Sequence, residues 1–120
     1  MQKQIFVNLA VGDLKKSIDF FTKLGFEFNP QFTNEDATCM IVGENIFVML
    51  LVEIFFKSFI KKELADPKKT TEVLMSLNSE SKENVDVFVD KAALAGALSV
   101  SSPTDHGFMY TRNFEDPDGH

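Results

Sequence analysis

The order of apolar patterns in the first half of the chain recurs in the second half, and this duplication restricts the fold more than any other feature. Each half opens with an apolar, β-forming segment, residues 5–11 and 71–77. Each continues with an amphipathic helix that a glycine follows, Gly25 in the first half and Gly96 in the second, and then returns to β-forming segments. A repeat of this kind indicates two similar supersecondary modules.

The first half predicts a strand, a helix and three more strands. Asp13 is a helix N-cap, because its short side chain can accept a hydrogen bond from the first turn, and apolar residues from Leu14 to Leu24 follow at helical spacing. Residues 53–64 are ambiguous, but their phenylalanines suit an amphipathic helix. The expected strands are 5–11, 26–32, 37–42 and 46–52.

The second half repeats this order over a shorter stretch. Its helix is marked by an apolar stripe that includes Val85, Phe88 and Ala92. The expected strands are 71–77, 98–100 and 108–114, and residues 101–107 form a loop. The residues from Asp116 to Gly119 strongly favour a turn, and we expect a final strand to be missing after it. We predict a single domain with module one at about 1–54, a linker helix at about 55–67 and module two at about 68–120.

Composition excludes several classes of function. The 120 residues are enough for one domain with a buried core. A formal net charge of −6 disfavours nucleic acid as a partner, because its phosphates are bound by basic surfaces. The single cysteine, Cys39, allows no intrachain disulfide, which is typical of a reducing compartment. With neither a secretory signal nor a membrane-spanning segment in the sequence, we expect a cytoplasmic protein with no membrane partner.

Two motifs at opposite ends of the chain carry a resemblance to a known superfamily. Together they resemble the vicinal oxygen chelate superfamily, which holds glyoxalases, bleomycin-resistance proteins and extradiol dioxygenases, and the resemblance covers nearly all of the chain. The matching residues are Val11-Gly12-Asp13-Leu14, Ser17, Phe20-Phe21 and Leu24-Gly25-Phe26 at the opening, and Phe114-Glu115-Asp116-Pro117-Asp118-Gly119-His120 at the close.

The resemblance implies an α+β fold of two βαβββ modules, whose curved mixed sheets surround a shared cavity. It also implies a homodimer and, in enzymes of the superfamily, a divalent metal held by His, Gln and Glu side chains. Phe6 stands at the first ligand position, and Val48 to Leu51 offer no hard ligand at the second. Glu72 at the third is a weak candidate metal ligand, with a water-facing carboxylate as the alternative, and the fourth lies beyond His120. We therefore expect no metal cofactor.

Strand alternation predicts which side chains face the cavity. We expect Tyr110 to be either a pocket hydroxyl or a half-buried ring. Arg112 either grips an acidic group of a ligand or forms a salt bridge to Glu115 or Asp116. We expect His106 and His120 to be surface histidines. The candidate ligand-binding residues are Phe6, Asn8, Glu72, Ser76, Tyr110 and Arg112.

These residues outline a mainly apolar pocket with a few orienting polar groups, which is typical of a small-molecule site. We expect a glyoxalase/bleomycin-resistance-like protein that binds or sequesters a small ligand without metal. The alternative is a divalent-metal-dependent lyase or isomerase of the glyoxalase (lactoylglutathione lyase) type. A third interpretation is a dimerisation module with a vestigial pocket. No residue is identified as catalytic, so whether the protein is an enzyme stays open.

Overall fold

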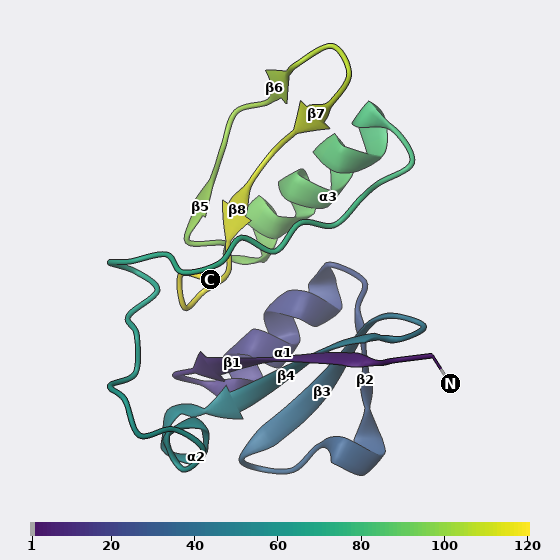
Figure 1. Ribbon diagram of the computed structural model, residues 1–120. Coiled ribbons are helices and arrows are strands. Elements are labelled where there is room, and N and C mark those ends of the chain that lie inside the picture. Colours follow the sequence, from purple (N-terminus) through teal and green to yellow (C-terminus); the bar gives the residue numbers. More distant parts are fainter. Residues whose placement is uncertain (1) are drawn as a thin grey trace. The chain divides into compact units, whose positions relative to one another are not determined.

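The computed structural model describes residues 2–120 and divides into two compact units, residues 1–64 and residues 65–120 (Figure 1). We call them unit 1 and unit 2. Each unit contains one long helix and its own strands, which agrees with the predicted α+β repeat. Within residues 2–120, no helix combines the length and the apolar character needed to cross a membrane.

Unit 1 is a four-stranded sheet with one helix, α1, packed on it (Figure 1). The strand order is β1-β4-β3-β2, with β1 parallel to β4 and the other pairs antiparallel. This is the predicted βαβββ order. The elements are β1 (Ile5–Val11), α1 (Leu14–Lys23), β2 (Glu27–Asn29), a 3₁₀ turn (Pro30–Phe32), β3 (Ala37–Gly43), β4 (Ile46–Val52) and α2 (Glu53–Lys57).

Helix α1 begins and ends where the sequence predicts. The Asp13 side chain accepts a hydrogen bond from the backbone N–H of Lys16 at 3.1 Å, and this contact satisfies a donor that the first turn leaves open. Gly25 follows the helix with a φ of +103°, a left-handed conformation that glycine adopts without a steric penalty. Phe20 and Phe21 lie on the buried side, with their rings edge to face at 5.0 Å.

Two expectations for unit 1 are wrong in extent. The strand expected over 26–32 stops at Asn29, because Pro30 cannot donate to a sheet and instead opens the 3₁₀ turn. We expected a linker helix over about 55–67, because residues 53–64 suit a helix. The structure has only α2 there, which ends at Lys57.

Unit 2 contains one long helix and four very short strands. In α3 (Lys82–Ala95), the Ser81 hydroxyl accepts a hydrogen bond from the Asn84 N–H at 3.1 Å, and Gly96 follows the helix with a φ of +109°. Strand β5 pairs with β8, and β6 pairs with β7, all antiparallel. The predicted strand over 108–114 is thus broken in two, and part of the expected loop is a strand. The strands are β5 (Ser99–Val100), β6 (Thr104–Asp105), β7 (Tyr110–Thr111) and β8 (Phe114–Glu115).

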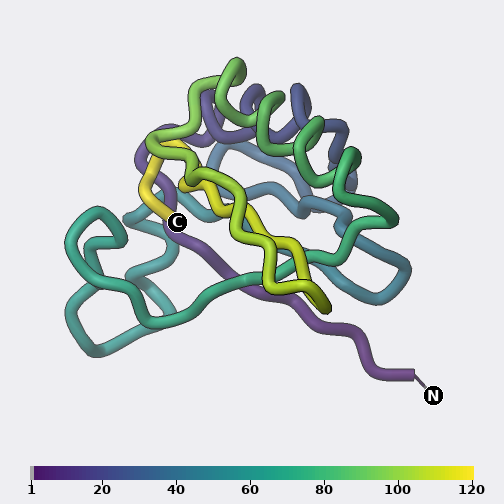
Figure 2. The backbone as a smooth tube through the Cα atoms, turned by 90° about the horizontal axis from the view of Figure 1, so that it is seen from above, coloured from purple at the N-terminus to yellow at the C-terminus, as the bar shows by residue number. Residues whose placement is uncertain are grey.

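The strand expected at 71–77 is not formed. In Figure 2 this part of the chain runs extended into α3, but it pairs with no strand of residues 2–120. Its apolar side chains are exposed, most of all Leu74 at 87%. The physical reason is that a strand depends on a hydrogen-bonding neighbour, which β1 finds in β4 and which 71–77 does not find within the described residues.

Candidate functional site

The position that the resemblance assigns to the first metal ligand carries an aromatic pair. Phe6 of β1 lies opposite Phe47 of β4 in the parallel register, and their rings stack with centroids 4.9 Å apart and an interplanar angle of 16°. Phe6 is 48% exposed. A partly exposed stack of two rings offers a flat apolar surface and no atom that can coordinate a metal.

Asn8 is the polar residue next to this pair on the same face of β1. It lies opposite Met49, and its Nδ2 donates a hydrogen bond to the Phe6 carbonyl oxygen at 3.2 Å. Alternation places Val7 and Leu9 on the other face, and both are more buried than Phe6 and Asn8. We call the surface formed by Phe6, Asn8, Phe47 and Met49 the β1–β4 face.

Strand β4 supplies no metal ligand at any register. Val48, Leu50 and Leu51 are buried, and Met49 is half-buried. Methionine sulfur is a soft donor. The resemblance implies instead a first-row divalent ion held by imidazole and carboxylate groups. The side chains of β1 and β4 therefore do not fit the metal that the resemblance implies.

Glu72 and Ser76 lie in the exposed, unpaired segment at 71–77. Both side chains are accessible to solvent. Because this segment forms no strand, the alternation that was used to place them on one face does not apply there. Their assignment to a pocket stays a prediction.

Tyr110 and Arg112 are engaged by helix α3. The Tyr110 hydroxyl donates to Asp86 Oδ1 at 2.9 Å. One terminal nitrogen of Arg112 lies 3.3 Å from Asp86 Oδ1 and 3.1 Å from Asp90 Oδ1, and its Nε donates to the Ser101 carbonyl at 3.2 Å. The salt-bridge alternative was right in kind, but the partners are not Glu115 or Asp116.

The same contacts change the chemistry of the tyrosine. Desolvation raises the pKa of Tyr110, and the hydrogen bond to Asp86 adds to the increase, so the phenol stays protonated as a donor. Phe114, in β8, packs its ring against Phe88 of α3 with centroids 5.7 Å apart. Tyr110, Arg112 and Phe114 therefore all contact α3, whereas strand alternation had placed Tyr110 and Arg112 on the cavity side.

Sequence reasoning missed the two acidic residues that bind Arg112. Asp86 and Asp90 are four residues apart, so they lie on one side of α3. That spacing, next to the apolar stripe of the same helix, was the signal that could have identified them as partners for the single arginine of the chain.

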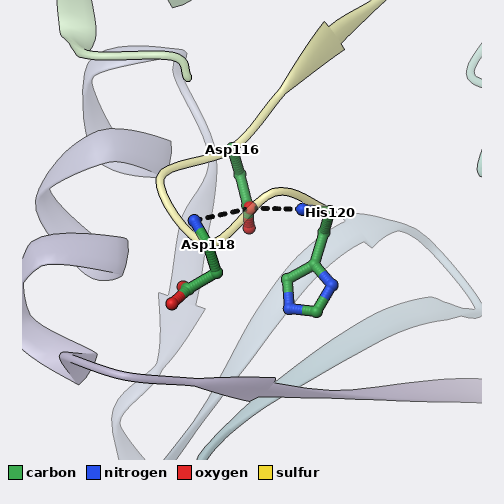
Figure 3. Close-up of side chains that lie close together, drawn as sticks. All are labelled: Asp116, Asp118 and His120. Carbon is green, nitrogen blue, oxygen red and sulfur yellow. Dashed lines mark hydrogen bonds between the residues drawn. The ribbon is translucent and has the colours of Figure 1, made fainter. Parts of the chain in front are cut away.

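The closing turn places a second group of polar side chains together (Figure 3). Asp116 Oδ1 accepts hydrogen bonds from the backbone N–H groups of Asp118 at 3.0 Å and His120 at 2.8 Å. The turn also closes through its backbone, since the Asp116 N–H donates to the His120 carbonyl at 2.9 Å. Gly119 has a φ of +97°, which the predicted turn requires.

Asp116 is almost completely buried, with 2% of its surface exposed. Its Oδ2 has no hydrogen-bond partner among the described residues. Burial raises the pKa of the Asp116 carboxyl, while the neighbouring His120 opposes that increase. The coordinating atoms of Asp116, Asp118 and His120 all lie within 4.8 Å of one another. We expected His120 to be a surface histidine. It is half-buried, and its side chain belongs to this cluster.

Comparison with known proteins agrees with the fold. The family described as bleomycin resistance protein-like N-terminal matches residues 3–43, which lie in unit 1. A crystal structure of a glyoxalase/bleomycin resistance protein/dioxygenase family enzyme from Burkholderia phytofirmans PsJN has a TM-score of 0.77 at 17% identity, covering 97% of this chain and 91% of that one. A glyoxalase-related enzyme from Fulvimarina pelagi has a TM-score of 0.82 at 17% identity, covering 100% of this chain and 84% of that one.

A third structure is much more similar in sequence. The hypothetical protein SA1046 from S. aureus is 32% identical, with a TM-score of 0.84, and the match covers 100% of this chain and 90% of that one. No curated protein matches the chain. The chain belongs to the same family as this S. aureus protein; it shares the fold of the two glyoxalase-related enzymes, and its residues 3–43 match the bleomycin resistance protein-like N-terminal family.

Proposed function

We propose that the protein binds or sequesters a small, mainly apolar ligand, and that the β1–β4 face contributes to the site without a metal. The observation that carries this proposal is the stacked pair of Phe6 and Phe47, which stands where enzymes of the superfamily place a metal ligand. The fold alone does not decide between binding and catalysis, because one fold carries many functions.

The chemistry of the β1–β4 face supports an apolar ligand with a planar part. Aromatic rings bind flat apolar groups by offset stacking, and Phe6 is exposed enough for such a contact. Small-molecule sites combine an apolar wall with a few polar groups that fix orientation. Asn8 supplies one such group, since its side-chain oxygen is an acceptor that is not used in the hydrogen bond from Nδ2.

The contacts of Arg112 argue against a leading role for that residue in ligand binding. Its guanidinium already binds two carboxylates, and an acidic ligand would have to compete with Asp86 and Asp90. We therefore place the recognition of the ligand on Phe6 and Asn8 first. Glu72 and Ser76 remain secondary candidates, because their exposed side chains are free to meet a ligand only if their segment adopts a defined position.

A titration with the apolar fluorescent probe 8-anilinonaphthalene-1-sulfonate tests this proposal. We expect saturable binding near one probe per chain, and we expect Phe6→Ser to weaken it about tenfold. Phe108→Ser is the matched control, because Phe108 is 89% exposed in unit 2 and its loss removes a surface ring elsewhere. Equal weakening by both variants, or none by Phe6→Ser, would reject the β1–β4 face as the site.

The divalent-metal lyase of the glyoxalase type is the competing function. It would need a metal coordinated by Glu72 and by residues other than Phe6. We include this function as the alternative that the experiment must exclude. Turnover of the thiol conjugate of a 2-oxoaldehyde that depends on added Ni²⁺ or Zn²⁺, and that Glu72→Gln abolishes, would replace our proposal with this one.

A further inference from the structure

The cluster at the closing turn has the composition of a cation site. Asp116, Asp118 and His120 lie at every second position of the chain, and the turn folds their coordinating atoms to within 4.8 Å of one another. Two carboxylates and one imidazole are a donor set that suits first-row divalent ions. The first of these residues is held rigidly, since Asp116 Oδ1 accepts two backbone N–H groups.

A second observation points to a missing ligand. Only 2% of the surface of Asp116 is exposed, yet its Oδ2 has no hydrogen-bond partner among residues 2–120. A buried carboxylate oxygen without a hydrogen-bond partner is costly, because it loses its hydration and no hydrogen bond replaces it. Figure 3 shows the Asp116 carboxylate lying between Asp118 and the His120 ring, so the unused oxygen belongs to the space that the cluster surrounds.

We propose that Asp116, Asp118 and His120 bind a divalent cation of the Zn²⁺ class within the closing turn of unit 2. Asp116 Oδ2, one oxygen of Asp118 and one imidazole nitrogen are the three protein ligands, and water completes the coordination. The cation would neutralise the charge of the buried carboxylate and link the first residue of the turn, Asp116, to the last, His120. The site uses none of the positions at which the superfamily's enzymes hold their metal, so it is independent of the ligand proposed for the β1–β4 face.

Isothermal titration calorimetry with ZnCl₂ tests this site on the intact protein. We expect one zinc ion per chain, and at least tenfold weaker binding for Asp118→Asn and for His120→Gln. Asp116→Asn should weaken binding as strongly while keeping the turn, since the asparagine Oδ1 can accept the same two N–H groups. His106→Gln is the matched control, because it removes the only other histidine, which sits in a similar loop after Asp105.

Two-dimensional NMR of the imidazole groups identifies the ligand directly, since the chain has only two histidines. We expect zinc to shift the His120 ring signals and to leave those of His106 in place. Absence of zinc binding at millimolar concentration would overturn the proposal, as would equal weakening by His106→Gln or a shift confined to His106. Zinc binding that survives all three cluster substitutions but is lost in Glu72→Gln would overturn both this site and the metal-free function.

Discussion

Units 1 and 2 repeat one order of strand and helix but are held together by different kinds of contact. Among residues 2–120, the buried apolar side chains all lie in unit 1 except Val89 and Ala92 of α3. In unit 2, ion pairs join α3 to Asp105 of β6 and to Arg112 between β7 and β8, whereas in the described part of unit 1 the exposed pair of Lys15 and Asp19 lies within α1. The comparison shows that a repeated pattern fixes the local elements but not the balance of forces between them.

The difference follows from how far the strands pair. In unit 1, β1 and β4 are both seven residues long and pair along their whole length, which lets alternate side chains form a continuous core. In unit 2 each strand is two residues long, and the apolar residues of 71–77 stay in solvent. Polar contacts such as those of Arg112 then carry more of the packing between the helix and the strands.

The largest effect is expected from a cavity in the core of unit 1. Phe20→Ala removes a ring that is 2% exposed, and we expect a loss of about 3–5 kcal/mol in the free energy of unfolding. Chemical denaturation followed by circular dichroism measures this loss. Phe108→Ala in unit 2, where the ring is exposed, should change the free energy by less than about 0.5 kcal/mol. Similar losses for both variants would break the contrast between the units.

The matched glycines Gly25 and Gly96 sharpen the comparison. Both follow a helix with a positive φ, and a methyl group at either would meet no atom within 4 Å, so only backbone strain opposes alanine. We expect Gly25→Ala and Gly96→Ala each to cost about 1–2 kcal/mol. If one thermal transition shifts equally in both variants, the units unfold together. If each variant shifts a different transition, they unfold separately, and a variant that is not destabilised would contradict the described cap.

The sequence predicts unit 1 better than unit 2 for a physical reason. The helix N-cap at Asp13, the stripe of α1 and the alternation of β1 are local patterns, and neighbouring strands of the same unit confirm them. The segment 71–77 is also mostly apolar, but a strand requires a partner as well, which the local pattern does not reveal.

The candidate site was predictable in part, because the identity of Phe6 excludes coordination whatever the fold. The partners of Arg112 depend on the docking of α3, and the cluster around Asp116 depends on how tightly the turn closes. Neither can be read from spacing alone.

Arg112→Met tests whether polar contacts hold unit 2 together. It keeps the apolar stem of the side chain but removes the pairs to Asp86 and Asp90, so we expect a smaller loss of stability than in the glycine variants. Amide hydrogen exchange should become several-fold faster in α3 and stay unchanged in α1. High salt should weaken the unaltered protein in the same place, because it screens these pairs. Equal acceleration in both helices would contradict the contrast.

The smallest effect is expected from the exposed pair of Lys82 and Asp105, whose charged atoms lie 2.8 Å apart. The hydrogen bond from Lys82 lowers the pKa of the Asp105 carboxyl below its ordinary value of 3.8. A carboxyl of lowered pKa stabilises the fold above its unfolded pKa, and that contribution is lost as the pH falls through its folded pKa. Asp105→Asn should therefore slightly reduce the acid dependence of Tm below about pH 4. An unchanged acid dependence would show that the pair contributes nothing.

The most direct test of the account is whether a metal approaches the β1–β4 face. Mn²⁺ broadens the NMR signals of nuclei close to where it binds, so a titration of the isotope-labelled protein reports each residue separately. We predict that, in the Asp118→Asn variant, which lacks a ligand of the cation site proposed at the closing turn, the amide signals of Phe6, Asn8 and Phe47 keep their line widths at one equivalent of Mn²⁺. Selective broadening of those three signals would show that a metal binds where the stacked rings lie, and would contradict a metal-free site.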